Sequence, residues 1–238
     1  MNNVANLTWD EVERRIADGA LAILPVGAGA KEHGWHLPMQ TDQIQAEWLA
    51  ARLAERFDAL VWPTLTYGHY PAFAAYAGSC SLSSDVFIAL VRDIAMSLLG
   101  FGPRLLVVDT GISTIAPIDK AIAGLDDKDR VLHLKVHDGP RYRDAALRLA
   151  TQVHGTHADE LETSRMLALA PELVVMARAE ASPATAPVRG PMQHADPDGA
   201  NYSRSGSIGD PNVATREKGE ALLAAMVADM KESVAHWL

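Results

Sequence analysis

Cysteine is nearly absent from the sequence, because Cys80 is the only one in 238 residues. A single cysteine excludes a disulfide bond within the chain and is typical of a protein kept in a reducing cytosol. Its small neighbours, in the stretch AGSCSL, predict an inert thiol buried in the core. The chain also lacks an apolar run near the ~20 residues that a transmembrane helix needs, and a signal peptide's basic and apolar segments. We therefore expect a cytoplasmic protein.

An excess of positive charge is absent as well. The chain has 21 Lys and Arg against 30 Asp and Glu, a formal net charge of −9. Such a surface repels nucleic acid and anionic membranes, so we expect neither as a partner. With 48% hydrophobic residues the composition is that of an ordinary globular protein with ample material for a core.

Short apolar runs alternate with helical patterns along the chain. After a helix that begins near Thr8, strands are predicted over 20–27, 59–65, 103–111 and 130–139. Helices are predicted over 42–57, with Asp42 as the cap, and within 83–102, where Gly100 ends the helix. Further helices are predicted after the third strand up to about 123, over 159–171 and over 214–236. This alternation predicts a mostly parallel sheet with both faces covered. We expect one domain over 1–238, with a Pro- and Gly-rich segment at 181–212 as a functional loop or contact surface.

Polar side chains gather where the first predicted strand ends. The stretch LPVGAGAKEHGWHLPMQTDQIQAEWLA places five of them within twelve residues: Lys31, Glu32, His33, His36 and Asp42. A second cluster follows at His154, His157, Asp159, Glu160 and Glu162. Ligands bind beyond the carboxyl ends of parallel strands, and imidazole with carboxylate suits Zn²⁺ or Mn²⁺. For each histidine alone, a solvated or hydrogen-bonded structural role is the alternative.

The stretch VGAGAKEHG lies between a predicted strand and a predicted helix, as dinucleotide-binding and phosphate-binding loops do. Both patterns require glycine where this chain has Glu32. That side chain would keep a pyrophosphate away from the helix N-terminus, so nucleotide binding is excluded as an explanation.

The stretch LPVGAGAKEHGWHLPMQTD resembles the opening signature of the creatininase family, LPVGS-x-EQHG-x-HLPL-x-TD. HADELETSRMLALAP and SGSIGDPNVATREKGEALL resemble two later segments of that family, and YAGSCSL stands where it has FPGT-x-S. The resemblance implies a three-layer αβα sandwich around a mainly parallel sheet, often assembled as a hexamer. It also implies a two-metal centre that hydrolyses cyclic or linear amide bonds.

This chain departs from the family at the ligand positions. Lys31 takes the place of the first Glu ligand, Gly111 that of a His, and Ser113 that of a carboxylate. The resemblance therefore implies either one divalent ion (Zn or Mn), held by the remaining set, or no metal at all. That remaining set is His33, Asp42 and Glu162.

Lys31 has three possible roles. Its ammonium group could replace the lost cation, pairing with Asp42 and Glu162 and polarising a substrate oxygen. It could instead have a lowered pKa and act as a base or nucleophile, or it could point to solvent beside a degenerate site. By the resemblance, His157 lies in the pocket and handles protons, so the predicted catalytic residues are His157, Lys31 and Glu162. His36 is expected to orient its neighbours.

The predicted function is hydrolysis of an amide or cyclic amide C–N bond in a small molecule, by a cytoplasmic homohexamer with zero or one metal ion per chain. One alternative is a metal-independent lyase, isomerase or cyclase that uses Lys31 and His157 in the same pocket. Another is a non-catalytic homologue that only binds a ligand.

Overall fold

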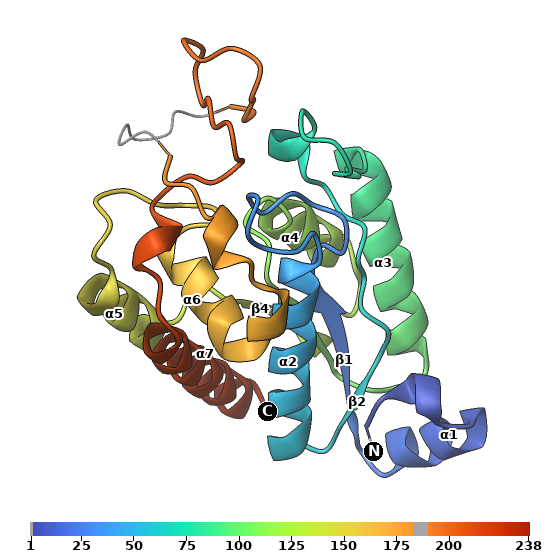
Figure 1. Ribbon diagram of the computed structural model, residues 1–238. Helices are drawn as coiled ribbons and strands as arrows, with labels where there is room; N and C mark the ends of the chain where they lie inside the picture. Colours follow the sequence, from blue (N-terminus) through green and yellow to red (C-terminus); the bar gives the residue numbers. More distant parts are fainter. Residues whose placement is uncertain (1, 183–189) are drawn as a thin grey trace.

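A four-stranded parallel sheet forms the centre of the molecule in the computed structural model, which describes residues 2–182 and 190–238 (Figure 1). The strands are β1 (Leu21–Val26), β2 (Ala59–Val61), β3 (Leu105–Asp109) and β4 (Val131–Lys135), in the order β2-β1-β3-β4. In this register Val26 lies opposite Asp109, and Asp109 opposite Lys135. The carboxyl ends of the three longer strands therefore meet at one edge.

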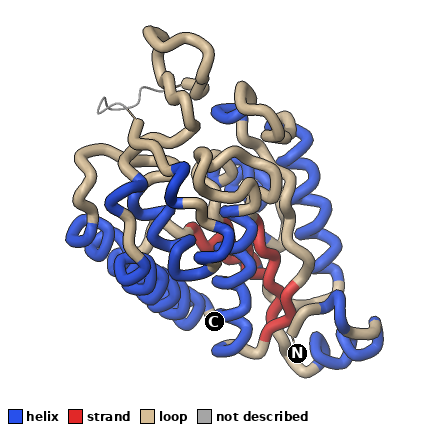
Figure 2. Tube along the Cα trace, in the orientation of Figure 1, coloured by secondary structure: helices blue, strands red, loops and turns tan. Residues whose placement is uncertain are grey.

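Helices cover both faces of the sheet (Figure 2). One face carries α2 (Thr41–Arg56), α5 (Pro140–Leu149) and α7 (Arg216–Trp237), with α6 (Glu160–Leu169) packed on α7; the other carries α3 (Ser84–Gly100) and α4 (Ile115–Ala123). Residues alternate along β1, so that Ile23 enters the first core and Leu24 the second. The predicted αβα sandwich with a parallel sheet is confirmed.

Several local predictions need correction. Asp42 does not cap α2, because Gln40 is the N-cap and the Asp42 carboxylate turns to Lys31 instead. The strand expected over 130–139 ends at Lys135, and the unpredicted helix α5 begins at Pro140. Cys80 is exposed rather than buried. The N-terminal helix α1 (Trp9–Ala17) does begin after Thr8, whose backbone N–H donates to Glu11.

The long segment at 181–212 lies partly outside the described residues, which omit 183–189. Its described remainder contains one short 3₁₀ helix (Pro211–Val213), and Figure 1 shows its middle part projecting beyond the helices as a loop. Its later part returns to the body, where the Ile208 N–H donates to the His157 carbonyl at 2.8 Å. No helix among the described residues combines the length and apolar character needed to cross a membrane.

Candidate active site at the carboxyl edge of the sheet

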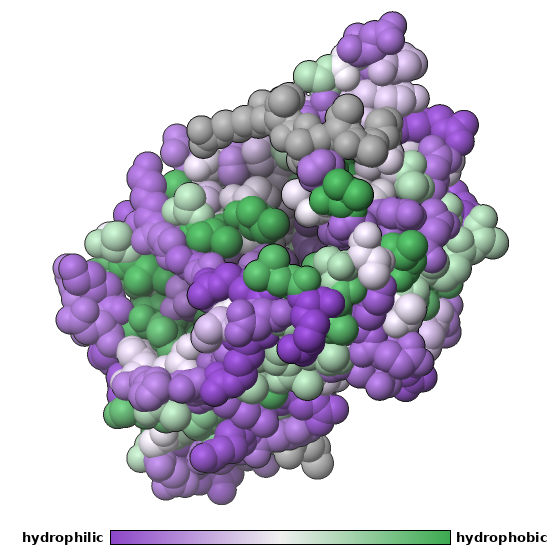
Figure 3. Space-filling model, turned by 90° about the vertical axis from the view of Figure 1, so that its left-hand side faces the viewer, coloured by the Kyte–Doolittle hydropathy of each residue, from purple (hydrophilic) through white to green (hydrophobic). Residues whose placement is uncertain are grey.

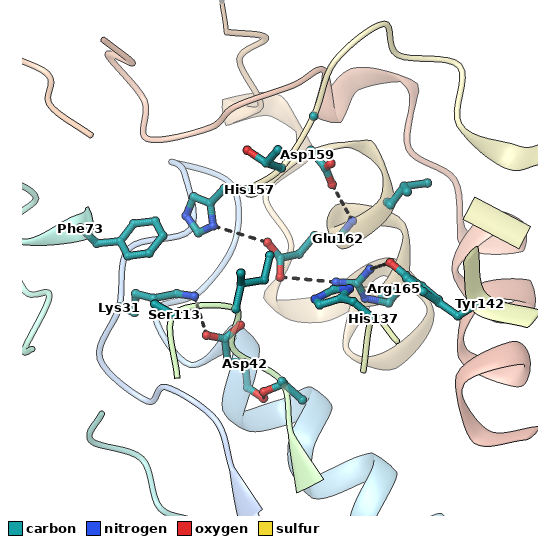
Figure 4. A pocket seen from close by; sticks show the side chains of 15 residues that line it. Lys31, Asp42, Phe73, Ser113, His137, Tyr142, His157, Asp159, Glu162 and Arg165 are labelled. Atoms are coloured by element: carbon teal, nitrogen blue, oxygen red, sulfur yellow. Dashed lines mark hydrogen bonds and ion pairs between the residues drawn. The ribbon is translucent and has the colours of Figure 1, made fainter. Parts of the chain in front are cut away.

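A cavity of about 250 Å³ opens at the carboxyl edge of the sheet. The loop after β1, the first turn of α2, the loop after β3 and the start of α6 all contribute to it (Figure 4). Figure 3 shows a hollow in this side of the molecule with hydrophobic side chains around it. The lining residues are Lys31, Asp42, Phe73, Thr110, Ile112, Ser113, His137, Tyr142, Gly155, Thr156, His157, Asp159, Leu161, Glu162 and Arg165. None of these belongs to the described part of the 181–212 segment.

Lys31 is buried and pairs with Asp42 at the base of this cavity. Its Nζ lies 2.6 Å from Asp42 Oδ2, and the two side chains are 7% and 2% exposed. The ammonium also faces the Phe73 ring, with 4.8 Å between Nζ and the ring centroid. Burial favours the neutral amine, but the carboxylates of Asp42 and Glu162 outweigh burial and raise the pKa of Lys31. Lys31 therefore does not point to solvent, and its charge state disfavours a role as a base.

His33 faces the same carboxylate from the other side. Its Nδ1 lies 2.9 Å from the Lys31 carbonyl oxygen, to which it can only donate, and its Nε2 lies 3.2 Å from Asp42 Oδ1. Burial disfavours the charged carboxylate, yet Lys31 and His33 outweigh burial and hold the pKa of Asp42 well below its usual value. Asp42 is thus a fixed anion between two basic side chains.

His157 pairs with Glu32, a residue for which the sequence suggested no role. His157 Nε2 donates to Glu32 Oε1 at 2.8 Å, and the backbone N–H of Gly34 donates to Glu32 Oε2 at 2.8 Å. The carboxylate fits only because Gly206 lies against it, at φ +95°, where an added Cβ would sit 1.9 Å from Oε2. Burial opposes the imidazolium, but Glu32 outweighs burial and raises the pKa of His157. This pairing leaves His157 Nδ1 free to face Glu162, 3.8 Å from its Oε2.

Glu162 occupies the centre of the cavity in Figure 4. Its Oε2 accepts from the backbone N–H of Ala158 at 2.9 Å, and Arg165 Nη2 lies 3.5 Å from its Oε1. Ala158 adopts φ 45°, a left-handed conformation that costs energy for a non-glycine residue and directs its N–H toward Glu162. Burial raises the pKa of Glu162, but the positive charges of His33, His157 and Arg165 together lower it to about 2. The carboxylate therefore remains ionised.

Arg165 holds this end of the cavity together. Its Nε donates to Gln45 Oε1 at 2.6 Å and its Nη1 to the Tyr142 hydroxyl at 3.1 Å. Three carboxylates in and behind the cavity thus each have a basic partner: Asp42 with Lys31, Glu32 with His157, and Glu162 with Arg165.

The remaining predicted polar residues divide into nearby and distant ones. His36 is buried with its Nε2 2.8 Å from Thr163 Oγ1, which fits an orienting role. Asp159 caps α6 by accepting from the Glu162 N–H, and Glu160 pairs with Lys218 away from the cavity. His154 is exposed and does not line the cavity.

Among the residues that the structure describes, one group of side chains has the geometry to hold a metal ion: His33, His157 and Glu162. Each offers one ligand atom, and these atoms lie within 4.8 Å of one another. His33 Nδ1 and His157 Nε2 each face a protein oxygen to which they donate, so His33 Nε2 and His157 Nδ1 are the atoms that a metal ion would use. Both nitrogens would have to be deprotonated, against the proton that Glu32 favours on His157 and the contact of His33 Nε2 with Asp42 Oδ1. Asp42, which the sequence places in the ligand set, lies beside His33 but is paired with Lys31.

Comparison with known proteins adds to this geometry. The family model described as creatininase, creatinine amidohydrolase, matches residues 5–234. A creatinine amidohydrolase of Pseudomonas putida is 32% identical over 254 residues, covering 97% of this chain and 95% of that protein. A mycofactocin precursor peptide peptidase of Mycobacterium tuberculosis is 28% identical over 228 residues, and the match covers 91% of this chain and 85% of that protein. A solved structure titled "Creatininase Mn" superposes with a TM-score of 0.84 at 29% identity, covering 99% of this chain and 98% of that one. A mutant creatininase of Zn-Zn type gives the same TM-score.

Proposed function

The chain belongs to the creatininase family, and from this premise we propose that it hydrolyses an amide or cyclic amide C–N bond of a small molecule. In this proposal Lys31 stands in place of one metal ion. The supporting observation is the buried pair of Lys31 and Asp42, which sets a fixed positive charge in the same cavity as His157 and Glu162.

Each side chain has a role that its partners prepare. The Lys31 ammonium, oriented by Asp42, donates to the carbonyl oxygen and stabilises the negative charge that forms there. The Glu162 carboxylate, held by Ala158 and Arg165, accepts a hydrogen bond from the attacking water. His157, kept protonated by Glu32, gives its Nδ1 proton to the leaving nitrogen and takes back the proton that the water releases. Water adds to the carbonyl carbon, the C–N bond breaks, and His157 ends the cycle protonated.

One divalent ion also fits the cavity. Zinc or manganese, the metals named for related creatininase structures, would be held by His33, His157 and Glu162, whose nitrogen and oxygen donors suit either ion. Such an ion would act as a Lewis acid on the carbonyl group. Within residues 2–182 and 190–238 a second ion has no comparable set, because Lys31, Gly111 and Ser113 offer no ligand that a cation prefers.

The test is hydrolysis of small cyclic amides by the full chain, with and without a chelator, followed by NMR. Removal of the ammonium in Lys31→Met should reduce turnover by about 10²–10³-fold, the usual effect of deleting an oxyanion donor, and added Zn²⁺ should restore none of it. Lys135→Met is the matched control, since Lys135 pairs with Asp119 outside the cavity. Full activity in Lys31→Met would contradict the role given to Lys31.

A second candidate is a metal-independent lyase or isomerase that uses Lys31 and His157 as acids. The pairing of Asp42, Glu32 and Glu162 with basic side chains favours it, because these three charges are balanced without an ion. Heavy-oxygen water separates the two: a hydrolase places the label in the product carboxylate, whereas a lyase or isomerase that adds no water leaves the product unlabelled.

We also propose that the chain forms a homo-oligomer, a hexamer by the family resemblance. The loop that projects from the body in the 181–212 segment is a surface such an assembly could bury. Light scattering at micromolar concentration should give a multiple of the 25.6 kDa chain mass.

A further inference from the structure

Phe73 contacts both of the side chains that act as acids in the proposed mechanism. The Lys31 Nζ lies over its ring, 4.8 Å from the centroid, and the His157 ring centroid lies 4.4 Å from that of Phe73. Figure 4 shows the Phe73 ring at the wall of the cavity, next to His157 and Lys31. Phe73 is 9% exposed, so little water reaches these contacts. One ring therefore links two basic groups that come from different loops.

The contact between the ring and the ammonium is attractive. The face of an aromatic ring carries partial negative charge, and it attracts a cation most strongly where water is excluded. The Lys31 side chain meets that condition, because it is buried against Asp42. The Tyr70 ring is a second aromatic neighbour, 5.8 Å from the Lys31 Nζ to the centroid. The ammonium is thus held by aromatic rings in addition to its carboxylate.

The same ring suits a centre with two cations. Two positive side chains in one small cavity repel each other, because little water is present to screen them. Lys31 and His157 each have a carboxylate partner, Asp42 and Glu32 respectively. A phenyl ring that contacts both cations adds attraction without adding a net charge, so it leaves this pairing undisturbed.

The backbone and a buried apolar cluster fix the position of Phe73. It is the last residue of a short 3₁₀ helix (Pro71–Phe73), and its N–H donates to the Tyr70 carbonyl at 3.1 Å. The cluster to which its side chain belongs consists of Ala28, Tyr70, Phe73, Tyr76 and Met192. A ring packed in this way cannot turn away from the cavity without breaking core contacts.

The long segment at 181–212 helps to hold this part of the chain. The Tyr76 hydroxyl donates to the Ser203 carbonyl at 2.7 Å, and the Met192 N–H donates to the Ala72 carbonyl at 2.8 Å. Although the described part of the segment does not line the cavity, it packs against the residues that carry Phe73.

We propose that Phe73 is a positioning residue of this centre, whose ring holds the Lys31 ammonium and the His157 ring in the arrangement that the reaction requires. The attraction of the ring face for the ammonium supplies the force. The inference rests on the proposed function for the reaction, whereas the attraction itself can be measured without a substrate. Through Tyr76 and Met192, the long segment supports the centre by way of this ring.

Fluorination of the ring tests the attraction while nearly preserving the shape of the side chain. In 3,4,5-trifluorophenylalanine, placed at position 73 by stop-codon suppression, the fluorine atoms withdraw negative charge from the ring face. Urea unfolding of the full chain should show a rise in the unfolding equilibrium constant that is about 5–30-fold larger with Lys31 present than in Lys31→Met. If Lys31→Met alone does not fold, Lys31→Met with Asp42→Asn provides the background without an ammonium.

The matched control is the same replacement at Phe87, which is buried in the core under α3. Its effect should be equal in the two backgrounds. At position 73, a difference between the backgrounds below about threefold overturns the proposal, because a ring that only fills space does not respond to the charge beside it.

Turnover gives a second readout. The trifluorinated ring should lower kcat about tenfold and change KM less than about threefold, because Phe73 acts on Lys31 and His157 rather than on the substrate. A ring with one fluorine, 4-fluorophenylalanine, withdraws less charge and should lie between the two. An unchanged kcat, or a loss confined to KM, overturns the positioning role.

The two readouts separate this inference from the proposed function. Fluorination that destabilises the fold only with Lys31 present, in a chain that hydrolyses no amide, retains the hold of Phe73 on Lys31 and refutes the hydrolase. Hydrolysis with full kcat in the trifluorinated protein does the reverse.

Discussion

Replacement of Lys31 by methionine should destabilise the fold, whatever reaction the cavity supports. Methionine has nearly the length of the lysine stem, so it fills the same space against Phe73 and leaves no cavity. What it removes is the ammonium 2.6 Å from Asp42 Oδ2. Breaking a buried ion pair on one side costs about 3–5 kcal/mol, because the remaining charge is buried without compensation. His33 stays beside Asp42 and retains part of the compensation, so we expect the lower end of that range.

The loss of stability in Lys31→Met should depend on pH, in a direction that follows from the pKa of Asp42. In the wild type the pKa of Asp42 is depressed, so its contribution to stability is present above the unfolded carboxyl pKa and is lost as the pH falls through the folded one. Without Lys31 the largest cause of that depression is gone, and burial raises the pKa of Asp42 toward and above the unfolded value. The variant therefore loses stability as the pH rises. The deficit relative to wild type should be larger at about pH 7.5 than at about pH 5.

Urea unfolding followed by fluorescence of the 5 tryptophans measures the deficit, at one fixed protein concentration because assembly would shift the midpoint. The double variant Lys31→Met with Asp42→Asn is the decisive comparison, since it removes both charges. It should recover more than half of the lost stability. A deficit below about 1 kcal/mol in the single variant, or a double variant less stable than the single one, would refute the buried ion pair as the structural role of Lys31.

Three further predictions concern the same centre and its assembly. Protein purified without chelator should contain zero or one divalent ion per chain by elemental analysis, and two tightly bound ions would contradict the loss of the second ligand set. Glu32→Gln should lower the pKa of His157, so the alkaline limb of the kcat/KM profile should move to lower pH by about 1 unit; an unmoved limb means that His157 is not the acid. Light scattering should show a mass well above 25.6 kDa, and a monomer at micromolar concentration would exclude the oligomer.

The framework of the fold was predictable because periodic patterns dominate local structure. The six buried residues of β1 read as an apolar run, and the helices that follow have clear starts and stops. The error at α2 has a physical cause. Asp42 has the residue type and position of a helix cap, but the attraction of a buried ammonium exceeds the energy of one capping hydrogen bond. α5 was missed because its pattern is short and it begins directly after a turn.

The sequence predicted most of the residues that form the site, but not which side chains pair with one another. His33, Asp42, His157 and Glu162 were all identified from motifs; Asp42, His157 and Glu162 line one cavity, and His33 lies behind them against Asp42. The partner of His157 is Glu32, 125 residues away in the sequence. Nothing in the local pattern around Glu32 indicates that its carboxylate contacts His157, which lies just before α6. His137 and Tyr142 were missed because neither belongs to a motif, and Arg165 was missed although it lies in the HADELETSRMLALAP segment, because that pattern does not show that its side chain turns to Glu162.

His157 Nδ1 is the atom at which the two forms of the proposed mechanism separate. Nε2 is committed to Glu32, so Nδ1 alone faces the cavity. It can hold a proton for the leaving nitrogen or a lone pair for a metal ion, and it cannot do both at once. Glu32 favours the proton by stabilising the imidazolium, and the nearby ammonium of Lys31 repels a second cation. Competition by the proton weakens metal binding most at low pH, whereas the repulsion by Lys31 is the same across the neutral range because its ammonium stays charged. In the proposed mechanism Lys31 and Glu32 therefore favour proton transfer over a metal, at a centre whose histidines and carboxylates match the family's motifs.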